Sequence, residues 1–182
     1  MSWNRRRVLM AGGLAALSAI GRPARSAGVR EPREARRIAF NNLHTPESLE
    51  VVYRHGEEYL PEALARLKTL LRDYRTGEEH PIDPALFDYL HDAARARGVD
   101  PVFSVISAYR SSRTNAMLHE RSSGVASKSL HMEGRAIDVR LAGIDCASLA
   151  DTALGLQRGG VGYYRQSNFV HLDTGRFRTW RG

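Results

Sequence analysis

Apolar residues recur at helical spacing in the first half of the chain. In residues 61–74 four leucines fall on one side of a helix, with basic residues between them. A second helix is expected to begin at Pro84, behind an N-cap at Asp83, and to end at Gly98. The pattern predicts two amphipathic helices in this half of the chain.

Shorter apolar runs predict strands. Residues 38–43 are expected to form one strand, and the β-branched run 102–106 a buried one. The second half of the chain predicts two more helices, over residues 113–121 and 148–156. It also predicts three more strands, over residues 135–141, 162–164 and 168–173. Gly159 and Gly160 are expected to end the last of these helices. The expected fold class is α+β, a small, mostly antiparallel sheet with helices packed on one side.

The N-terminus has the pattern of an export signal. Three arginines at positions 5–7 precede an apolar stretch over 8–20, so residues 1–27 are expected to be a signal peptide of the twin-arginine type. An ordinary Sec-type leader is the alternative. The apolar stretch is shorter than the about 20 residues that span a bilayer, which favours a cleaved leader over a permanent membrane anchor. The mature protein is therefore expected to be periplasmic or otherwise exported.

The rest of the chain reads as one domain. Residues 28–37 are polar and charged, and we expect them to form an exposed lead-in. With 182 residues, of which 42% are hydrophobic, the chain can bury one sizeable core but hardly two. Residues 38–182 are therefore expected to form a single domain.

Charge and cysteine content exclude some partners and sites. The formal net charge is +7, but the arginines are scattered or lie in the leader, and no basic run is interleaved with aromatic residues as a single-strand binding groove requires. No nucleic-acid partner is expected. The single cysteine, Cys146, excludes an intramolecular disulfide and a cluster of thiolate metal ligands.

The stretch around Gly134 is the first candidate for chemistry. In the strand that is expected after this glycine, Ile137 and Val139 share one face and Asp138 points to the other. The apolar face belongs to the core, so Asp138 is expected to face a cleft. His131 lies just before Gly134, a residue that can supply the turn needed to fold the histidine back over the strand.

The closing strand repeats this alternation. Val170 and Leu172 share its apolar face, while His171 and Asp173 share the other. The two polar residues are two positions apart, roughly 6 to 7 Å along the strand. That separation suits one metal ligand and one supporting or catalytic group.

His131, Asp138 and His171 together form a candidate zinc site. Two imidazoles and one carboxylate are a donor set appropriate to Zn²⁺. Three protein ligands leave the fourth position of a tetrahedral ion open, as a hydrolytic site needs and a structural site does not.

The motif Ser129-x-His131-x-x-Gly134-x-Ala136-x-Asp138 resembles the signature of the zinc D-alanyl-D-alanine carboxypeptidases and endopeptidases, a superfamily that includes lysostaphin and the hedgehog signalling domain. Other stretches are similar to the murein endopeptidase K branch of that superfamily. They are Asn42-x-His44-Thr45-x-Glu47, Tyr109-Arg110-Ser111, Gly159-Gly160-Val161-Gly162-Tyr163-Tyr164 and Phe169-Val170-His171-x-Asp173-Thr174-Gly175, with Trp180 near the end. The resemblance covers nearly all of the chain behind the leader. It implies a zinc peptidase domain that hydrolyses peptide bonds in peptidoglycan.

The resemblance also implies roles for residues around the metal. Arg110 matches an arginine that meets the substrate or its developing oxyanion in related carboxypeptidases, and a surface arginine that closes a turn is the alternative. Ser129 could hydrogen-bond near the metal or only satisfy its own loop. His44, at the end of a strand, could approach the cleft and bind substrate.

One position departs from the resemblance. Many relatives carry a glutamate three residues, or a histidine two residues, before the last zinc ligand, and that group acts as the general base. Here Asn168 and Phe169 stand at those positions, and neither can take a proton from water. Asp173 is the first candidate for the base and Glu133 the second. Asp173 could instead orient the ring of His171.

The expected activity is therefore a zinc-dependent murein endopeptidase that hydrolyses cross-links between peptidoglycan stem peptides. Two alternatives stay open. One is a D,D-carboxypeptidase that trims terminal D-alanine, and the other is a noncatalytic, zinc-bearing module that binds the cell wall.

Overall fold

A computed structural model describes residues 35–121 and 125–182, which belong to one compact unit of the chain, residues 32–182. The expected signal peptide, residues 1–27, lies outside the described residues, as do residues 28–34 of the expected lead-in. The described part contains eight strands: β1 (Ala35–Asn42), β2 (Ser48–His55), β3 (Glu58–Tyr59), β4 (Val102–Ser107), β5 (Ala136–Leu141), β6 (Gly160–Tyr164), β7 (Phe169–Asp173) and β8 (Arg178–Arg181). Its helices are α1 (Pro61–Leu70), α2 (Pro84–Ala96), α3 (Ser112–Arg121) and α4 (Cys146–Leu156), with a 3-10 turn, η1, over Leu130–Glu133.

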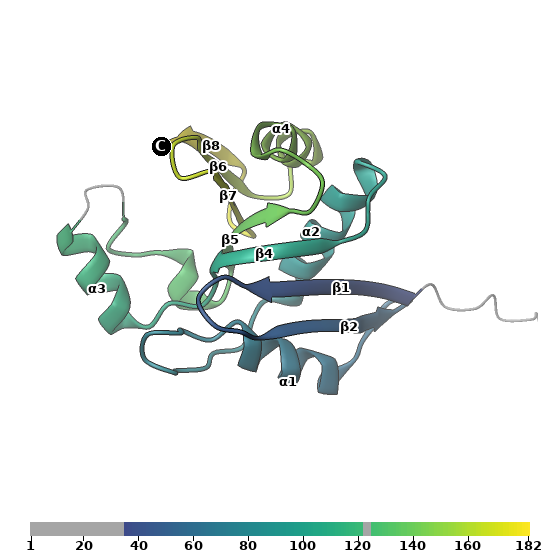
Figure 1. The fold of residues 1–182 in the computed structure, drawn as a ribbon, viewed down its shortest axis with the longest axis horizontal. Coiled ribbons are helices and arrows are strands. Elements are labelled where there is room, and N and C mark those ends of the chain that lie inside the picture. Colours follow the sequence, from purple (N-terminus) through teal and green to yellow (C-terminus); the bar gives the residue numbers. More distant parts are fainter. Residues whose placement is uncertain (1–34, 122–124) are drawn as a thin grey trace, which may run out of the picture. The chain divides into compact units, whose positions relative to one another are not determined.

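The strands form one sheet in the order β3-β2-β1-β4-β5-β7-β6-β8. Two of its neighbouring pairs are parallel, β1 with β4 and β6 with β8, and the others are antiparallel. The expectation of an α+β fold with a mostly antiparallel sheet is therefore confirmed. Figure 1 shows the strands that carry the predicted site, β5 and β7, in the middle of this order.

One face of the sheet carries the hydrophobic core. Alternate residues of the strands point into it, among them the fully buried Phe40, Phe103, Val139 and Leu172. The helices α1, α2 and α4 contribute buried side chains to the same cluster, which agrees with the expected packing of helices on one side. The other face of β5 and β7 is left for polar side chains.

The N-terminal half of the sheet differs from the expectation in two ways. β1 begins at Ala35, so the last residues of the expected lead-in already pair with β2. β2 itself was not predicted, although Leu49, Val51 and Tyr53 fall on one face of this strand and lie in or against the core. The strand follows the short turn after β1 and completes a hairpin.

The bounds of two helices differ from the prediction. α1 stops at Leu70 rather than at residue 74, and in the turn that follows it Gly77 donates its N–H to the Asp73 carbonyl. α4 begins at Cys146, behind an N-cap at Asp145, and its last turn is closed by Gln157 in the left-handed region with φ 53°. Gly159 and Gly160 therefore do not end this helix, and their role lies in the site described below.

A buried carboxylate joins the turn after α1 to the start of α3. Asp73, 2% exposed, accepts hydrogen bonds from both the hydroxyl and the backbone N–H of Ser111, at 2.6 and 2.9 Å. The Ser111 hydroxyl in turn accepts from the N–H of Thr114 and caps α3. Burial alone would raise the pKa of Asp73, but these hydrogen bonds outweigh it and lower the pKa to about 2.

We expect Asp73→Asn to destabilise the fold by about 2 kcal/mol at neutral pH. Folding lowers the pKa of this carboxyl from 3.8 to about 2, so its stabilising effect is complete above the unfolded value and is lost as the pH falls through the folded value. Urea unfolding at a series of pH values should show the difference between variant and wild type shrinking below pH 4. Asp151→Asn, an exposed change on α4, is the matched control, and an equal pH dependence for both variants would contradict the assignment.

Candidate active site

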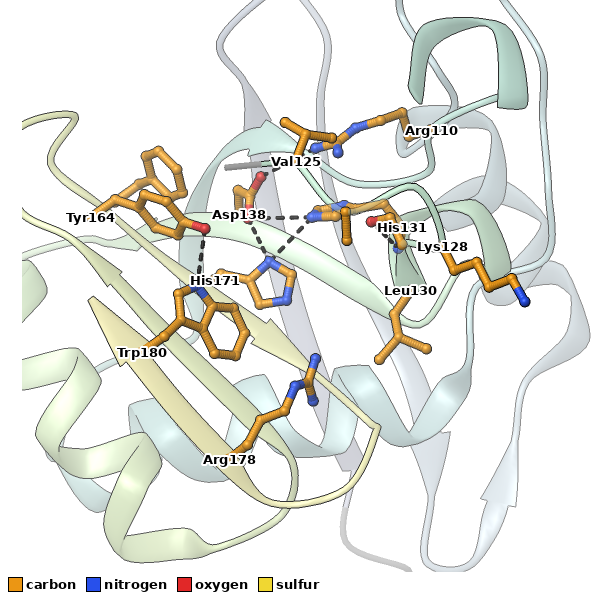
Figure 2. A pocket seen from close by; sticks show the side chains of 13 residues that line it. Arg110, Val125, Lys128, Leu130, His131, Asp138, Tyr164, His171, Arg178 and Trp180 are labelled. Atoms are coloured by element: carbon orange, nitrogen blue, oxygen red, sulfur yellow. Dashed lines mark hydrogen bonds and ion pairs between the residues drawn. The ribbon is translucent and has the colours of Figure 1, made fainter. Parts of the chain in front are cut away.

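A pocket of about 390 Å³ opens over the polar face of β5 and β7. Its floor is formed by His131, Asp138 and His171, and Figure 2 shows the side chains that surround them. Arg110 borders the floor on one side, and side chains from β6 and β8 on the other. The three residues predicted as metal ligands are thus brought together at the base of a cleft.

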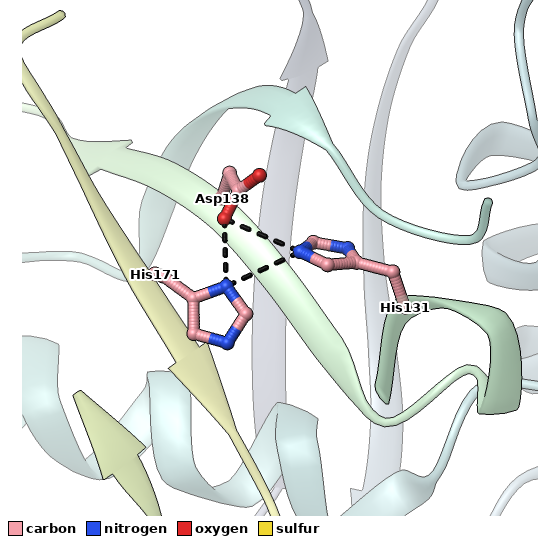
Figure 3. Close-up of side chains that lie close together, drawn as sticks. All are labelled: His131, Asp138 and His171. Carbon is pink, nitrogen blue, oxygen red and sulfur yellow. Dashed lines mark hydrogen bonds and ion pairs between the residues drawn. The ribbon is translucent and has the colours of Figure 1, made fainter. Parts of the chain in front are cut away.

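The three floor residues point one donor atom each toward a common centre (Figure 3). His171 Nδ1 lies 2.9 Å from Asp138 Oδ1 and 3.2 Å from His131 Nε2. His131 Nε2 lies 3.4 Å from the same Asp138 oxygen. All three residues are at least nine-tenths buried, so their donor atoms are shielded from bulk water.

Two of the donors are placed by the sheet register. Asp138 on β5 is the direct partner of His171 on β7 in the antiparallel ladder. Their neighbours Val139 and Val170 form the next pair, and both are fully buried on the opposite face. The alternation read from the sequence is therefore confirmed, and it makes the carboxylate and the imidazole face each other across adjacent strands.

The third donor comes from the turn η1. His131 follows Ser129, whose hydroxyl accepts the His131 N–H at 3.4 Å and starts the turn. Gly134 ends it in the left-handed region with φ 65°, which confirms the turn predicted at this glycine. A Cβ at Gly134 would also collide with the carbonyl oxygen of Pro81, so glycine is required by space as well as by conformation.

Both imidazoles are held in the tautomer that frees a lone pair at the centre. His131 donates Nδ1–H to the carbonyl of Ala108 at 2.6 Å, which leaves Nε2 as an acceptor. His171 donates Nε2–H to Asp173 Oδ2 at 3.0 Å, which leaves Nδ1 facing Asp138. Such outer partners fix the ring orientation of metal-bound histidines.

Asp173 is fully buried, and both of its carboxylate oxygens accept hydrogen bonds. Besides His171 it binds Arg178 through both oxygens, at 2.9 and 2.7 Å, and accepts the backbone N–H groups of Gly160 and Gly175. A Cβ at Gly160 would overlap its carboxylate, and one at Gly159 its backbone carbonyl. These glycines therefore make room for Asp173, behind the imidazole.

The charges of the site explain the direction of each pKa shift. Burial lowers the pKa of His131. Burial would raise the pKa of Asp138, but the two imidazoles hold it well below its usual range. Burial would likewise lower the pKa of His171, yet the carboxylates of Asp138 and Asp173 beside its ring raise it. Asp173, bonded to His171 and Arg178, has a lowered pKa despite its burial and is ionised.

The donor set fits a tetrahedral zinc ion. Nitrogen and oxygen ligands at usual zinc distances, set at tetrahedral angles, lie about 3.3 Å from one another. The separations of 2.9, 3.2 and 3.4 Å among the three donors agree with this spacing. Neutral imidazoles and an ionised carboxylate are the forms in which these side chain types bind metals.

Arg110 lies on the far side of Asp138. Its guanidinium approaches the second carboxylate oxygen of Asp138 at 3.7 Å and contacts Ser107 and Asn115 at 3.4 and 3.5 Å. Its Nε is buried and has no hydrogen-bond partner among the described residues. Asn115, on α3, also donates to the carbonyls of residues 126 and 127 and so ties the rim of the pocket to Arg110.

Two residues that were expected in the site lie elsewhere. The Glu133 side chain is 57% exposed, pairs with Arg135 and does not line the pocket. His44 stacks on Tyr74, with ring centroids 3.9 Å apart, and its Nε2 contacts the Ile106 carbonyl, also away from the pocket. Ser129 does line it.

Other pocket residues were not singled out as site residues. Lys128 lies at the rim, Phe169 and Tyr164 form one wall, and Arg178 and Trp180 arrive from β8. The alternation of β7 places Phe169 on the face of His171 and could have predicted it. The β8 residues had no such signal, because the strand is four residues long and was not predicted.

Comparison with known proteins identifies relatives over almost the whole sequence. The family described as peptidoglycan L,D-endopeptidase MepK matches residues 30–180. The chain is 44% identical to the peptidoglycan L,D-endopeptidase MepK of Escherichia coli K12 over 177 residues, which are 97% of each chain. It is 39% identical to the probable peptidoglycan L,D-endopeptidase MepK of Haemophilus influenzae over 180 residues, 98% of this chain and 96% of that one. No solved structure matches the chain.

Asp173→Asn should weaken zinc binding by about 10- to 100-fold, because His171 loses the carboxylate that orients it. Competition with a chromogenic chelator measures the affinity, and the thermal midpoint reports folding separately. Asp151→Asn on α4 provides the matched control. An unchanged zinc affinity in folded Asp173→Asn protein would rule out this role for the carboxylate.

Proposed function

The chain belongs to the peptidoglycan L,D-endopeptidase MepK family, and on this premise we propose that it is a zinc-dependent murein endopeptidase that cleaves peptide cross-links between an L- and a D-centre. The observation that carries the proposal is the group of His131, Asp138 and His171, whose donor atoms converge at the base of a pocket. A metallopeptidase needs this arrangement, and a structural metal site does not need an open pocket above it.

We infer that zinc is held by these three side chains. When bound there, it supplies Lewis-acid chemistry, polarising a carbonyl and making water a better nucleophile near neutral pH. Other residues of the chain hold the three ligands in the orientation that zinc binding requires. Ala108 and Asp173 orient the two imidazoles, and the sheet register aligns Asp138 with His171.

Arg110 is proposed to act on the substrate from the edge of the floor. It carries a buried guanidinium with an unpartnered Nε, and it lines the pocket next to Asp138. A desolvated cation at this position favours negative charge on a substrate carboxylate or a developing oxyanion. Its contact with Asp138 Oδ2 also keeps that oxygen away from the shared centre.

The positions of the two candidate carboxylates bear on which group can act as the general base. Asp173 is enclosed by His171, Arg178 and backbone N–H groups, which supports the orienting role over the role of a base. Glu133 is exposed outside the pocket. Among the described residues that line the pocket, Asp138 is the only carboxylate, so we propose that neither Asp173 nor Glu133 receives the proton of the attacking water directly.

The pocket suits an anionic peptide. Lys128 stands at its rim, Arg110 and Arg178 border the floor, and Ser129 offers a hydroxyl. Stem peptides carry free carboxylates, which cations in a partly desolvated cleft attract. We therefore keep Ser129 and Arg110 as proposed substrate-binding residues. His44 lies outside the pocket, so a role for it in substrate binding requires a substrate that extends beyond the pocket.

An exported location follows from the proposed substrate. A peptidoglycan hydrolase meets its substrate outside the cytoplasm, which agrees with the leader expected over residues 1–27. Among the helices in the described part of the chain, none is both long and apolar enough to cross a bilayer. We propose that the mature protein is periplasmic.

Of the two alternatives, neither has a specific observation in its favour. The relatives named above are endopeptidases, not D,D-carboxypeptidases. A noncatalytic wall-binding module would not need an imidazole and a carboxylate with free donor atoms facing an open pocket. Product analysis separates all three, since only an endopeptidase releases monomers from cross-linked dimers.

His131→Ala should abolish release of monomers from L,D-cross-linked muropeptides and reduce bound zinc by at least tenfold, because two ligands remain. Liquid chromatography of the digest and elemental analysis of the protein give the two readouts. His55→Ala, on β2 and away from the pocket, is the control. Unchanged digestion by the His131 variant would contradict the proposal.

Glu133→Gln should keep kcat within about threefold of wild type, since the side chain does not reach the pocket, whereas loss of a general base costs about 10²- to 10⁴-fold. Steady-state kinetics on a defined cross-linked muropeptide measures this. A loss of 100-fold or more in the folded variant would restore Glu133 as the base.

A further inference from the structure

The wall of the pocket opposite Arg110 contains a hydroxyl with a defined hydrogen-bond state. Trp180 Nε1 lies 3.0 Å from the Tyr164 hydroxyl oxygen. An indole N–H can only donate, so the tyrosine oxygen is the acceptor in this contact. The Tyr164 hydroxyl hydrogen has no acceptor among the described residues and is available to a group in the pocket that both side chains line.

The sheet holds Trp180 where it can make this contact. Gly162 on β6 is the ladder partner of His171 on one side and of Trp180 on the other. A Cβ at Gly162 would overlap the indole ring. The glycine therefore leaves a gap in which the Trp180 ring lies against His171, with ring centroids 5.1 Å apart.

Tyr164 is fixed from its other side. Its ladder partner on β7 is Phe169, and the two rings stack with centroids 4.5 Å apart and planes 16° from parallel. This stacking limits rotation of the Tyr164 side chain, while the bond from Trp180 sets the position of its oxygen. Figure 2 shows the hydroxyl directed toward the His131–Asp138–His171 group, with Arg110 on the other side of that group.

We propose that Tyr164 is a further catalytic residue, whose hydroxyl donates a hydrogen bond to the carbonyl oxygen of the scissile peptide bond as negative charge develops there. Trp180 is the positioning residue that fixes this donor. The inference rests on the proposed hydrolysis of cross-linked peptides. A preorganised donor of this kind acts mainly in the transition state and so raises kcat more than it lowers KM.

Tyr164→Phe tests the hydroxyl alone, because the stacking on Phe169 is retained. Kinetics on a defined cross-linked muropeptide should show kcat reduced by about 10- to 100-fold with KM changed by less than threefold. Tyr163→Phe, the neighbouring change on a side chain that packs against the core, should match wild type. Wild-type turnover by Tyr164→Phe, or a loss of zinc or of thermal stability in that variant, would overturn the proposal.

A phosphinate analogue of the cross-linked peptide gives a readout that a structural role would not move. It should bind Tyr164→Phe about tenfold or more weakly than wild type, while an uncleavable ground-state analogue binds both alike. Equal loss for both analogues would contradict a role in the transition state. Wild-type protein that fails to hydrolyse the substrate would instead refute the proposed function itself.

Trp180→Phe tests the positioning residue. It should lower kcat in the same direction but less than Tyr164→Phe, and the double variant should be no slower than Tyr164→Phe alone, because both changes act through one hydroxyl. Fully additive losses would show that the indole acts independently of Tyr164 and would overturn its assigned role.

Discussion

The cross-strand pair of Asp138 and His171 is the contact on which the rest of the site depends. It exists only in one register of β5 and β7, since a slip of either strand by one residue would turn that strand's polar side chain toward the core. The buried partners on the other face, such as Val139 and Val170, make that slip costly because they would then face the polar pocket. Core packing and site geometry are therefore two results of the same strand alignment.

A chain of ionised and hydrogen-bonding side chains runs through this pair. Arg178, Asp173, His171, Asp138 and Arg110 follow one another in contact, from β8 to the turn before α3. Buried charges are costly unless each finds a partner of opposite sign, and here each carboxylate lies between cationic or donor groups. Removing any one member would leave its neighbours uncompensated. The site is thus rigid for electrostatic reasons as well as for steric ones.

The sequence was informative where periodicity and local chemistry act over a few residues. Period-two alternation predicts that Asp138 and His171 leave the core, and the glycine before the strand predicts the turn that carries His131. It is uninformative where the position of a side chain depends on a distant partner. Trp180 lies in a strand too short to show a pattern, and its place depends on the gap at Gly162. Neither residue carries a local signal for that contact.

The edges of the sheet have a bearing on how the molecule behaves at high concentration. β3 at one edge is two residues long, and β8 at the other is four residues long with Arg178 and Arg181 at its ends. Long, flat, apolar edges invite pairing with other chains, whereas short edges and charged side chains resist it. The strand that completes the pocket wall thus also protects the sheet from edge-to-edge aggregation, and the arginine that holds Asp173 contributes to both effects.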